Sequence, residues 1–138
     1  MNPTELVRLA KTAMQRAYVP YSGYKVGAAL LTKGGKVYLG CNIENAAFGP
    51  SNCAERTAFF TAIAAGEMEF ESIAVVGGKD GVVTDIFPPC GVCRQVMQEF
   101  CAPDFMIYMG RGDDSYEGVP LEQLLPYGFN AAKYMSAK

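Results

Sequence analysis

Two short cysteine motifs are the parts of this sequence best suited to chemistry. The first is Cys-Ala-Glu at residues 53–55, and the second is Cys-Gly-Val-Cys at residues 90–93. Each stands where a loop gives way to a predicted helix, and helix N-termini favour thiolates because they carry unpaired N–H groups and partial positive charge. Three thiolates meeting there predict a tetrahedral zinc site with Cys53, Cys90 and Cys93 as ligands. Its fourth position would be open, as in catalytic zinc sites.

Glu55 is the predicted proton carrier of this site. It stands two residues after Cys53, on the first helical turn, and from there it can reach a water on the metal without binding the metal itself. A carboxylate in that position can take a proton from the water and deliver it to a substrate. The sequence has no histidine, the usual group for this task near neutral pH. The alternative, a glutamate favoured only by the helix dipole, is weakened by the two cysteine motifs beside it.

The two remaining cysteines leave alternatives open. Cys41 lies in a strand pattern and Cys101 follows a helix end, where a buried free thiol is usual. If either were a fourth ligand, the zinc site would be closed and structural. A redox Cys-x-x-Cys pair is a further alternative. Five cysteines without a secretory leader fit a disulfide framework poorly.

A three-thiolate zinc site carries excess negative charge, which makes the metal a weaker Lewis acid. A hydrogen-bond donor outside the ligand set should therefore offset part of that charge. Arg56 follows Glu55 and Arg94 follows Cys93. We expect Arg56 to fill the role, because it shares the helical turn of the first ligand. The alternative for each arginine is a solvent-facing surface position.

The elements that must position these residues alternate between helices and strands. The predicted order is a helix starting at residue 3 and ended by Pro20, strands at Val26–Thr32 and Val37–Ile43 with a turn between them, a helix at Cys53–Ala65 stopped by Gly66, a strand at Ser72–Val76, a loop at Gly77–Pro89, a helix at Cys90–Phe100, a strand at Phe105–Met109, a polar turn at Gly110–Gly118 and a short helix within Pro120–Leu125. The first two strands form a hairpin, and the later strands alternate with helices and should be parallel. The pattern predicts an α/β fold with a mixed sheet and a single domain over residues 1–138.

Composition narrows the possible functions. The formal net charge is −2 and charged residues make up 19% of the chain, which argues against a large nucleic-acid footprint. No apolar stretch reaches the roughly 18 to 20 residues needed to span a bilayer, and no targeting segment is visible. We expect a cytoplasmic protein that acts on a small molecule, with neither nucleic acid nor membrane as a partner.

The two motifs together resemble the signature of the zinc deaminases, Cys-Ala-Glu followed by Pro-Cys-x-x-Cys. The resemblance to the homotetrameric cytidine deaminases extends over nearly the whole chain. It is carried by Val-Pro-Tyr-Ser at 19–22, Val-Gly-Ala-Ala-Leu at 26–30, Gly-Cys-Asn-Ile-Glu-Asn-Ala at 40–46, Asn-Cys-Ala-Glu-Arg-Thr at 52–57 and Cys-Arg-Gln-Val at 93–96. It implies a three-layer α/β/α fold with a mixed central sheet of about five strands. It also implies one Zn²⁺ per subunit and a homotetramer whose active sites are completed by neighbouring subunits.

The resemblance assigns substrate contacts within the subunit. Asn42 and Glu44 would hold a ribose hydroxyl, and their spacing on a strand would put both side chains on one face. The backbone of Ala54 would contact the pyrimidine ring. Tyr24 would stack near the base, at a position where the family often has Phe. Without the resemblance, Asn42 and Glu44 could simply shape the loop, and Tyr24 would be read as a core aromatic.

Three further residues would act across subunits. Ala46 and Phe48 match a loop that the family contributes to a neighbouring site, and Phe129 resembles an aromatic that reaches a neighbour's cleft. The family commonly has Tyr at the position of Phe48, so any contact through that hydroxyl is missing here. Without the resemblance, Phe129 would be read as a core aromatic.

The implied reaction is the hydrolytic deamination of cytidine and deoxycytidine to uridine and deoxyuridine, with release of ammonia, in pyrimidine salvage. Glu55 would take a proton from the metal-bound water, and the hydroxide would attack C4 of the cytosine ring. Glu55 would then protonate the ring nitrogen and help the amino group leave. Two alternatives are a deaminase of another substrate (a nucleotide, an aminopyrimidine antibiotic or a base within RNA or DNA) and a non-catalytic zinc module that binds a partner. The sequence has no glycine-rich phosphate cradle and no concentrated basic patch, and Glu44 would repel a nearby phosphate.

Overall fold

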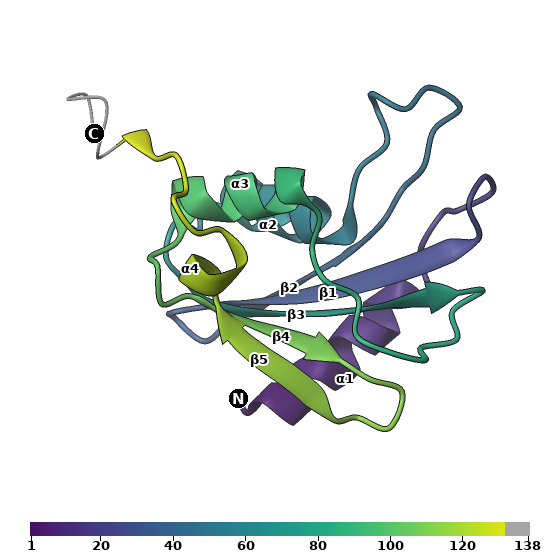
Figure 1. The fold of residues 1–138 in the computed structure, drawn as a ribbon, viewed down its shortest axis with the longest axis horizontal. Helices are drawn as coiled ribbons and strands as arrows, with labels where there is room; N and C mark the ends of the chain where they lie inside the picture. The colour runs from purple at the N-terminus through teal and green to yellow at the C-terminus, as the bar shows by residue number, and fades with distance from the viewer. Residues whose placement is uncertain (132–138) are drawn as a thin grey trace.

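The computed structural model describes residues 1–131 as a five-stranded mixed sheet with helices on both faces (Figure 1). In chain order the elements are α1 (Pro3–Met14), β1 (Tyr24–Thr32), β2 (Val37–Cys41), α2 (Ala54–Ala64), β3 (Phe70–Lys79), α3 (Gly91–Phe100), β4 (Met106–Gly110), β5 (Tyr116–Pro120) and α4 (Leu121–Leu124). This is the three-layer arrangement with about five strands that the resemblance implies.

The strand order across the sheet is β2-β1-β3-β4-β5. β1 pairs antiparallel with β2 as a hairpin, and on its other side it pairs antiparallel with β3. β3 and β4 are parallel, as expected for strands joined through a helix, here α3. β4 then turns back antiparallel into β5. The carboxyl end of β3 and the helix that follows it therefore lie next to the hairpin that carries the residues around position 42.

Alternating side chains on β1 build a core on each face of the sheet. Val26, Ala28 and Leu30 pack in the cluster beneath α2 and α3, whereas Ala29 and Leu31 pack against α1. This alternation follows from the period of two in a strand, and a strand buried on both faces reads as one continuous apolar run. The sheet thus holds α2 and α3 side by side on one face, with α1 alone on the other (Figure 1).

Two elements end earlier than expected. The first helix, α1, starts at the predicted residue, because the Asn2 side chain caps it by accepting a hydrogen bond from the Glu5 N–H at 2.9 Å. It ends at Met14, well before Pro20, because bonds from the N–H groups of residues 16 and 17 to the carbonyls three residues earlier tighten the last turn. β2 ends at Cys41 rather than at Ile43.

One strand is longer than predicted, and another was not predicted at all. β3 continues to Lys79, through residues 77–79 that were expected to be loop, because the backbone of Gly77 and Gly78 keeps pairing with β1. The expected polar turn at Gly110–Gly118 contains the start of β5. Ladder pairing uses backbone N–H and C=O groups, so polar or glycine-containing segments can extend a sheet where a core strand already offers an edge.

None of the helices within residues 1–131 has the length and apolar composition of a membrane span. The single domain over residues 1–138 and the cytoplasmic location stay predictions.

Candidate active site

The three cysteines of the two motifs meet at the starts of two neighbouring helices. Cys53 is the N-cap residue of α2, Cys90 is the N-cap residue of α3, and Cys93 lies in the first turn of α3. The Sγ atoms of Cys53 and Cys90 are 3.6 Å apart, and those of Cys90 and Cys93 are 3.5 Å apart. All three sulfur atoms lie within 4.8 Å of one another.

This geometry fits a zinc ion. Tetrahedral zinc with Zn–S bonds of about 2.3 Å places its sulfur ligands about 3.8 Å apart. The separations of 3.6 and 3.5 Å lie within a few tenths of an ångström of that value, and the third is no longer than 4.8 Å. In residues 1–131, neither Cys41 nor Cys101 belongs to the group. The cluster therefore offers three ligands and leaves the fourth tetrahedral position free, which is the arrangement of a catalytic rather than a structural site.

Charge around the cluster favours a thiolate. A guanidinium nitrogen of Arg56 donates to Cys53 Sγ at 3.2 Å. The pKa of the Cys53 thiol is lowered to about 5, first by the hydrogen bond from Cys93 and then by Arg56, against the opposing effect of burial. That same bond, together with burial, raises the pKa of Cys93. One sulfur is thus prepared for metal binding, and the proton on its neighbour must leave when a metal ion binds.

Arg94 has a different role from Arg56. Its guanidinium donates to the backbone carbonyls of Pro89 and Leu124, both at 2.8 Å. Pro89 directly precedes Cys90, and Leu124 ends α4. Arg94 therefore joins the loop before the second cysteine motif to the C-terminal part of the chain, and these two hydrogen bonds go to carbonyls rather than to a thiol.

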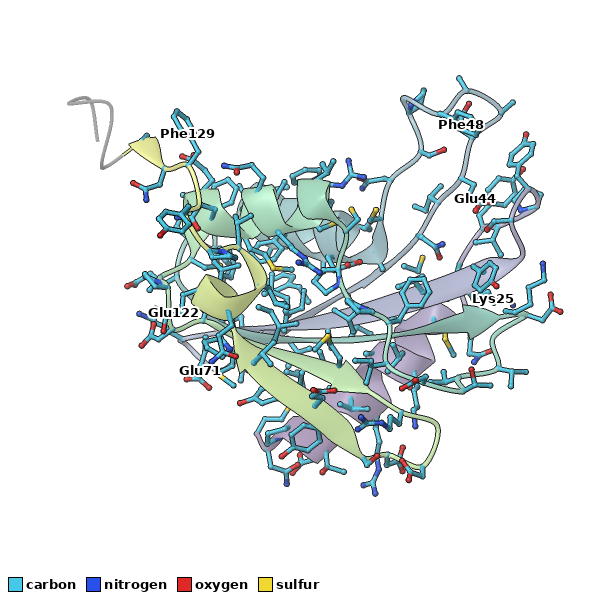
Figure 2. All side chains as sticks on the ribbon, in the orientation of Figure 1. Lys25, Glu44, Phe48, Glu71, Glu122 and Phe129 are labelled. Carbon is cyan, nitrogen blue, oxygen red and sulfur yellow. The ribbon has the colours of Figure 1, made fainter. Side chains whose placement is uncertain are left out.

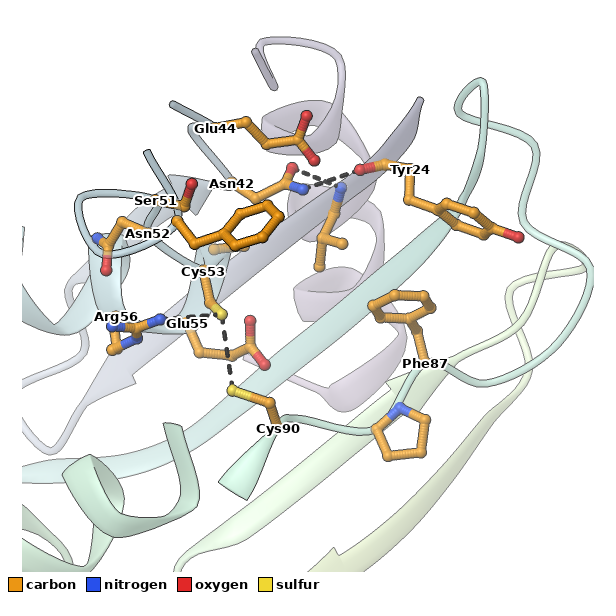
Figure 3. Close-up of a pocket in the computed structure, with 14 residues that line it drawn as sticks. Tyr24, Asn42, Glu44, Ser51, Asn52, Cys53, Glu55, Arg56, Phe87 and Cys90 are labelled. Atoms are coloured by element: carbon orange, nitrogen blue, oxygen red, sulfur yellow. Dashed lines mark hydrogen bonds between the residues drawn. The ribbon is translucent and has the colours of Figure 1, made fainter. Parts of the chain in front are cut away.

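Glu55 lies on the first turn of α2 with only 3% of its surface exposed. Burial raises the pKa of this carboxyl to about 7, and the charge of Cys53 acts in the same direction. Within the described part of the chain, Glu55 Oε1 is buried without a hydrogen-bond partner. Figure 3 shows the carboxylate beside the sulfurs of Cys53 and Cys90. A buried acid with unused hydrogen-bonding capacity that titrates near neutrality is suited to hold a water or ligand and to move a proton.

A cleft of about 350 Å³ opens above the cluster (Figure 3). That volume lies in the range of small-molecule sites. It is lined by Tyr24, Val26, Asn42, Glu44, Phe48, Ser51, Asn52, Cys53, Ala54, Glu55, Arg56, Phe87, Pro88 and Cys90. Most of the substrate-binding residues expected from the sequence thus line one space, together with Glu55 and two of the cysteines.

Asn42 presents a fixed amide to this cleft. Its Oδ1 accepts from the Val26 N–H at 2.9 Å, and its Nδ2 donates to the Tyr24 carbonyl at 2.8 Å. These two partners fix which end of the amide is oxygen and which is nitrogen. One N–H of Nδ2 and one lone pair of Oδ1 remain for a ligand. Although β2 ends before Asn42, the side chain still lines the same cleft as Glu44.

Glu44 is held by the turn that precedes β1. Its Oε1 accepts from the backbone N–H groups of Tyr21 at 3.0 Å and Ser22 at 3.1 Å, and its Oε2 accepts from the Ser22 hydroxyl. The Ser22 hydroxyl is the main cause of a lowered pKa for this carboxyl, and the two backbone N–H groups add to it. Glu44 is therefore an ionised acceptor at neutral pH.

Phe87 is a cleft residue that the sequence reasoning missed. Its ring stacks on Tyr24 with centroids 6.4 Å apart and planes 30° apart, so that the two rings form an aromatic wall. Such a wall suits a flat heterocycle. The available signal was position, because Phe87 stands in the short segment directly before Cys90.

Two of the expected residues lie outside the cleft of their own chain. Ala46 is exposed on the loop at residues 44–52, and Phe129 is 54% exposed. Phe48 lines the cleft, but it is 93% exposed. Figure 2 shows Phe48 and Phe129 at opposite ends of the α2–α3 layer. The Gln95 side chain donates to the Phe129 carbonyl at 2.9 Å and so fixes the backbone there to α3.

Known proteins are similar to this chain in sequence and in fold. Residues 1–109 match the family model described as the cytidine and deoxycytidylate deaminase zinc-binding region. A cytidine deaminase of Sporosarcina psychrophila is 45% identical over 130 residues, which cover 94% of this chain and 93% of the relative. One of Halalkalibacterium halodurans is 46% identical over 131 residues, covering 95% and 96%.

The solved structures to which the chain is similar are also cytidine deaminases. The crystal structure of cytidine deaminase from Burkholderia pseudomallei has a TM-score of 0.86 and 46% identity, covering 94% of this chain and all of that one. The crystal structure of cytidine deaminase from Mycobacterium tuberculosis has a TM-score of 0.78 and 34% identity, covering 94% and 98%. The chain belongs to the cytidine and deoxycytidylate deaminase zinc-binding family, and its cofactor is zinc.

Proposed function

We propose that this enzyme hydrolyses the exocyclic C–N bond of cytidine and deoxycytidine, giving uridine or deoxyuridine and ammonia. The observation that carries the proposal is the buried carboxyl oxygen of Glu55, which has no hydrogen-bond partner among residues 1–131 and lies beside three sulfur atoms that are close enough to hold a metal ion. A structural zinc site needs no such carboxylate next to an open position. The names of the relatives, which are cytidine deaminases, support the same substrate class.

We assign the zinc to Cys53, Cys90 and Cys93, and when bound it would activate the water that replaces the amino group at C4. Glu55 accepts one proton of that water and passes it to the ring nitrogen. It then carries the second proton to the amino group, which leaves as ammonia when the C4–N bond breaks. Arg56 offsets part of the sulfur charge.

Substrate binding follows from what each group can donate or accept. The backbone of Ala54, at the cleft floor, contacts the pyrimidine, and Tyr24 stacks near it. The remaining N–H of Asn42 donates to a ribose hydroxyl, and the ionised Glu44 accepts from it. A hydroxyl satisfies both partners, whereas a phosphate would face the negative charge of Glu44. This arrangement favours a nucleoside over a nucleotide.

The proposal extends to the assembly and its setting. Phe48 is 93% exposed and Phe129 is 54% exposed on the single chain, so both rings are accessible to a neighbouring subunit. We propose a homotetramer in which Ala46, Phe48 and Phe129 reach the clefts of neighbouring subunits. A cytoplasmic role in pyrimidine salvage belongs to the same proposal.

The test is ammonia release from cytidine by zinc-loaded protein. A chelator-stripped sample, the same sample after zinc is restored, and the Glu55→Gln variant run beside it. Glu55→Gln keeps the fold and the cysteine ligands, so it should retain zinc and lose nearly all turnover. Substantial activity in that variant would remove Glu55 from its role. A folded, zinc-loaded wild type without turnover on any aminopyrimidine nucleoside would favour a non-catalytic zinc module instead.

A further inference from the structure

The hydroxyl of Ser22 connects two residues of the substrate cleft. Ser22 Oγ accepts from the Tyr24 N–H at 3.0 Å and donates to Oε2 of Glu44. A serine hydroxyl has a single proton, so donation to Glu44 uses its whole donor capacity. The N–H of Tyr24 occupies its acceptor side and orients that proton toward the carboxylate.

The other oxygen of Glu44 is fixed by the same turn. The backbone N–H groups of Tyr21 and Ser22 both point to Oε1, at 3.0 and 3.1 Å. Three donors from two consecutive residues therefore hold the two oxygens. A carboxylate can accept about four hydrogen bonds, so Oε2 keeps a lone pair for a ligand in the cleft.

The end of β3 makes this turn rigid. Lys79 Nζ donates to the Ser22 carbonyl at 2.9 Å and lies 5.3 Å from the centroid of the Tyr24 ring. The Asp80 N–H donates to the Gly23 carbonyl at 2.7 Å. Ser22 is thus anchored on its backbone and engaged through its side chain.

We propose that Ser22 is a positioning residue for sugar recognition, which holds the Glu44 carboxylate in the one orientation that accepts a substrate hydroxyl. The inference rests on the proposed function, because it takes the cleft to bind a nucleoside and Glu44 to face the sugar. Glu44 is a flexible, partly exposed side chain, and fixing it before the substrate arrives removes an entropy cost from binding. The lowered pKa of Glu44 agrees with this role, since its main cause is the Ser22 hydroxyl.

The test is to measure KM and kcat separately for the zinc-loaded Ser22→Ala variant and to compare both with wild type. KM for cytidine should rise roughly tenfold, as for loss of one hydrogen bond to a charged group, while kcat stays within about twofold. Ser22→Thr keeps the hydroxyl and should recover most of the loss, whereas Ser22→Cys, a weak donor of similar size, should not. The matched control is Ser115→Ala, because Ser115 also donates its hydroxyl to a carboxylate, Asp113 at 2.6 Å, on the β4–β5 turn outside the cleft. That control should leave both constants unchanged.

A double-mutant cycle separates this inference from the proposed function. Glu44→Gln alone should raise KM, and adding Ser22→Ala to it should raise KM little further, because the partner of the hydroxyl is already changed. If wild type does not deaminate cytidine, or if Glu44→Gln leaves KM unchanged, both the sugar contact and the inference fail. If Glu44→Gln raises KM but Ser22→Ala does not, or if the two effects multiply, only the positioning role of Ser22 is overturned.

Discussion

Arg56 is the residue that we propose offsets the negative charge of the sulfur cluster. Its guanidinium donates to Cys53 Sγ and spreads positive charge over a cluster that is rich in sulfur. Replacement by Gln keeps an N–H donor, but it shortens the side chain and removes the charge. We predict that Arg56→Gln weakens zinc binding about 10- to 100-fold, the usual cost of losing a partner of a metal ligand. Competition with a chromophoric chelator measures this directly.

The control for that prediction is Arg8→Gln. Arg8 is an exposed arginine that forms an ion pair with Asp114, and it does not line the cleft. It should hold zinc as tightly as wild type. Equal affinity in the two variants would show that Arg56 does not offset the sulfur charge.

Residue types alone predicted the cysteine cluster that the structure brings together, and the buried Glu55 beside it, because few chemistries need Cys-Ala-Glu and Cys-x-x-Cys together at helix starts. They did not reveal Ser22. Its contact with Glu44 depends on a backbone pairing in which Tyr18 N–H donates to the Asn42 carbonyl and Glu44 N–H donates to the Tyr18 carbonyl. That pairing joins two loops far apart in the chain, and no local pattern encodes it.

At the scale of elements, Gly40 determines how closely α2 approaches the sheet. A Cβ on Gly40 would lie 2.3 Å from the Ala54 carbonyl oxygen and 2.5 Å from the Ala58 nitrogen. We predict that Gly40→Ala pushes the start of α2 off β2 and displaces both Cys53 and Glu55. Stability should fall by about 1–3 kcal/mol, the usual cost of overpacking, and zinc content should fall with it. Thermal unfolding and metal analysis of the purified variant provide the two readouts.

Gly34→Ala is the matched control, since its Cβ would meet only the Thr32 hydroxyl, at 3.8 Å. It should behave as wild type. A Gly40→Ala variant with full zinc content and an unchanged melting temperature would contradict the close approach.

Elements with a buried, periodic pattern were predictable, and the edges of the sheet were not. β1 and the helices that begin at the cysteine motifs follow from apolar runs and from turn residues. β5 has the composition of a turn and is a strand because β4 offers it an edge to pair with. The late end of β3 has the same cause, since its glycines pair with β1. Backbone pairing of this kind depends on neighbours in space, which local sequence does not specify.

At the scale of the whole molecule, the exposed Phe129 makes the proposed tetramer testable by mixing subunits. Under that proposal, Glu55→Gln removes the proton carrier of its own cleft, and Phe129→Ala removes the ring that reaches a neighbouring cleft. Each homotetramer should therefore turn over cytidine poorly. We predict that co-expressed, doubly tagged mixtures regain activity well above the average of the two parents, because some clefts combine Glu55 from one subunit with Phe129 from another.

Light scattering on the same mixtures checks that the assembly stays intact. If Phe129 serves only its own chain, the mixture will show no more than the weighted average of the parent activities. That result, or a monomeric mass for wild type, would refute the shared cleft.

The position of the cysteines at two helix starts has a consequence for folding. Cys53 and the pair Cys90 and Cys93 are separated by α2, β3 and the loop that follows, so a bound ion closes that whole segment into a ring. An unfolded chain cannot hold these sulfurs together without paying the loop-closure entropy, and the ion therefore favours the native state much as a cross-link does. Zinc affinity and resistance to unfolding are therefore thermodynamically linked, and a bound ion also holds the starts of α2 and α3 together.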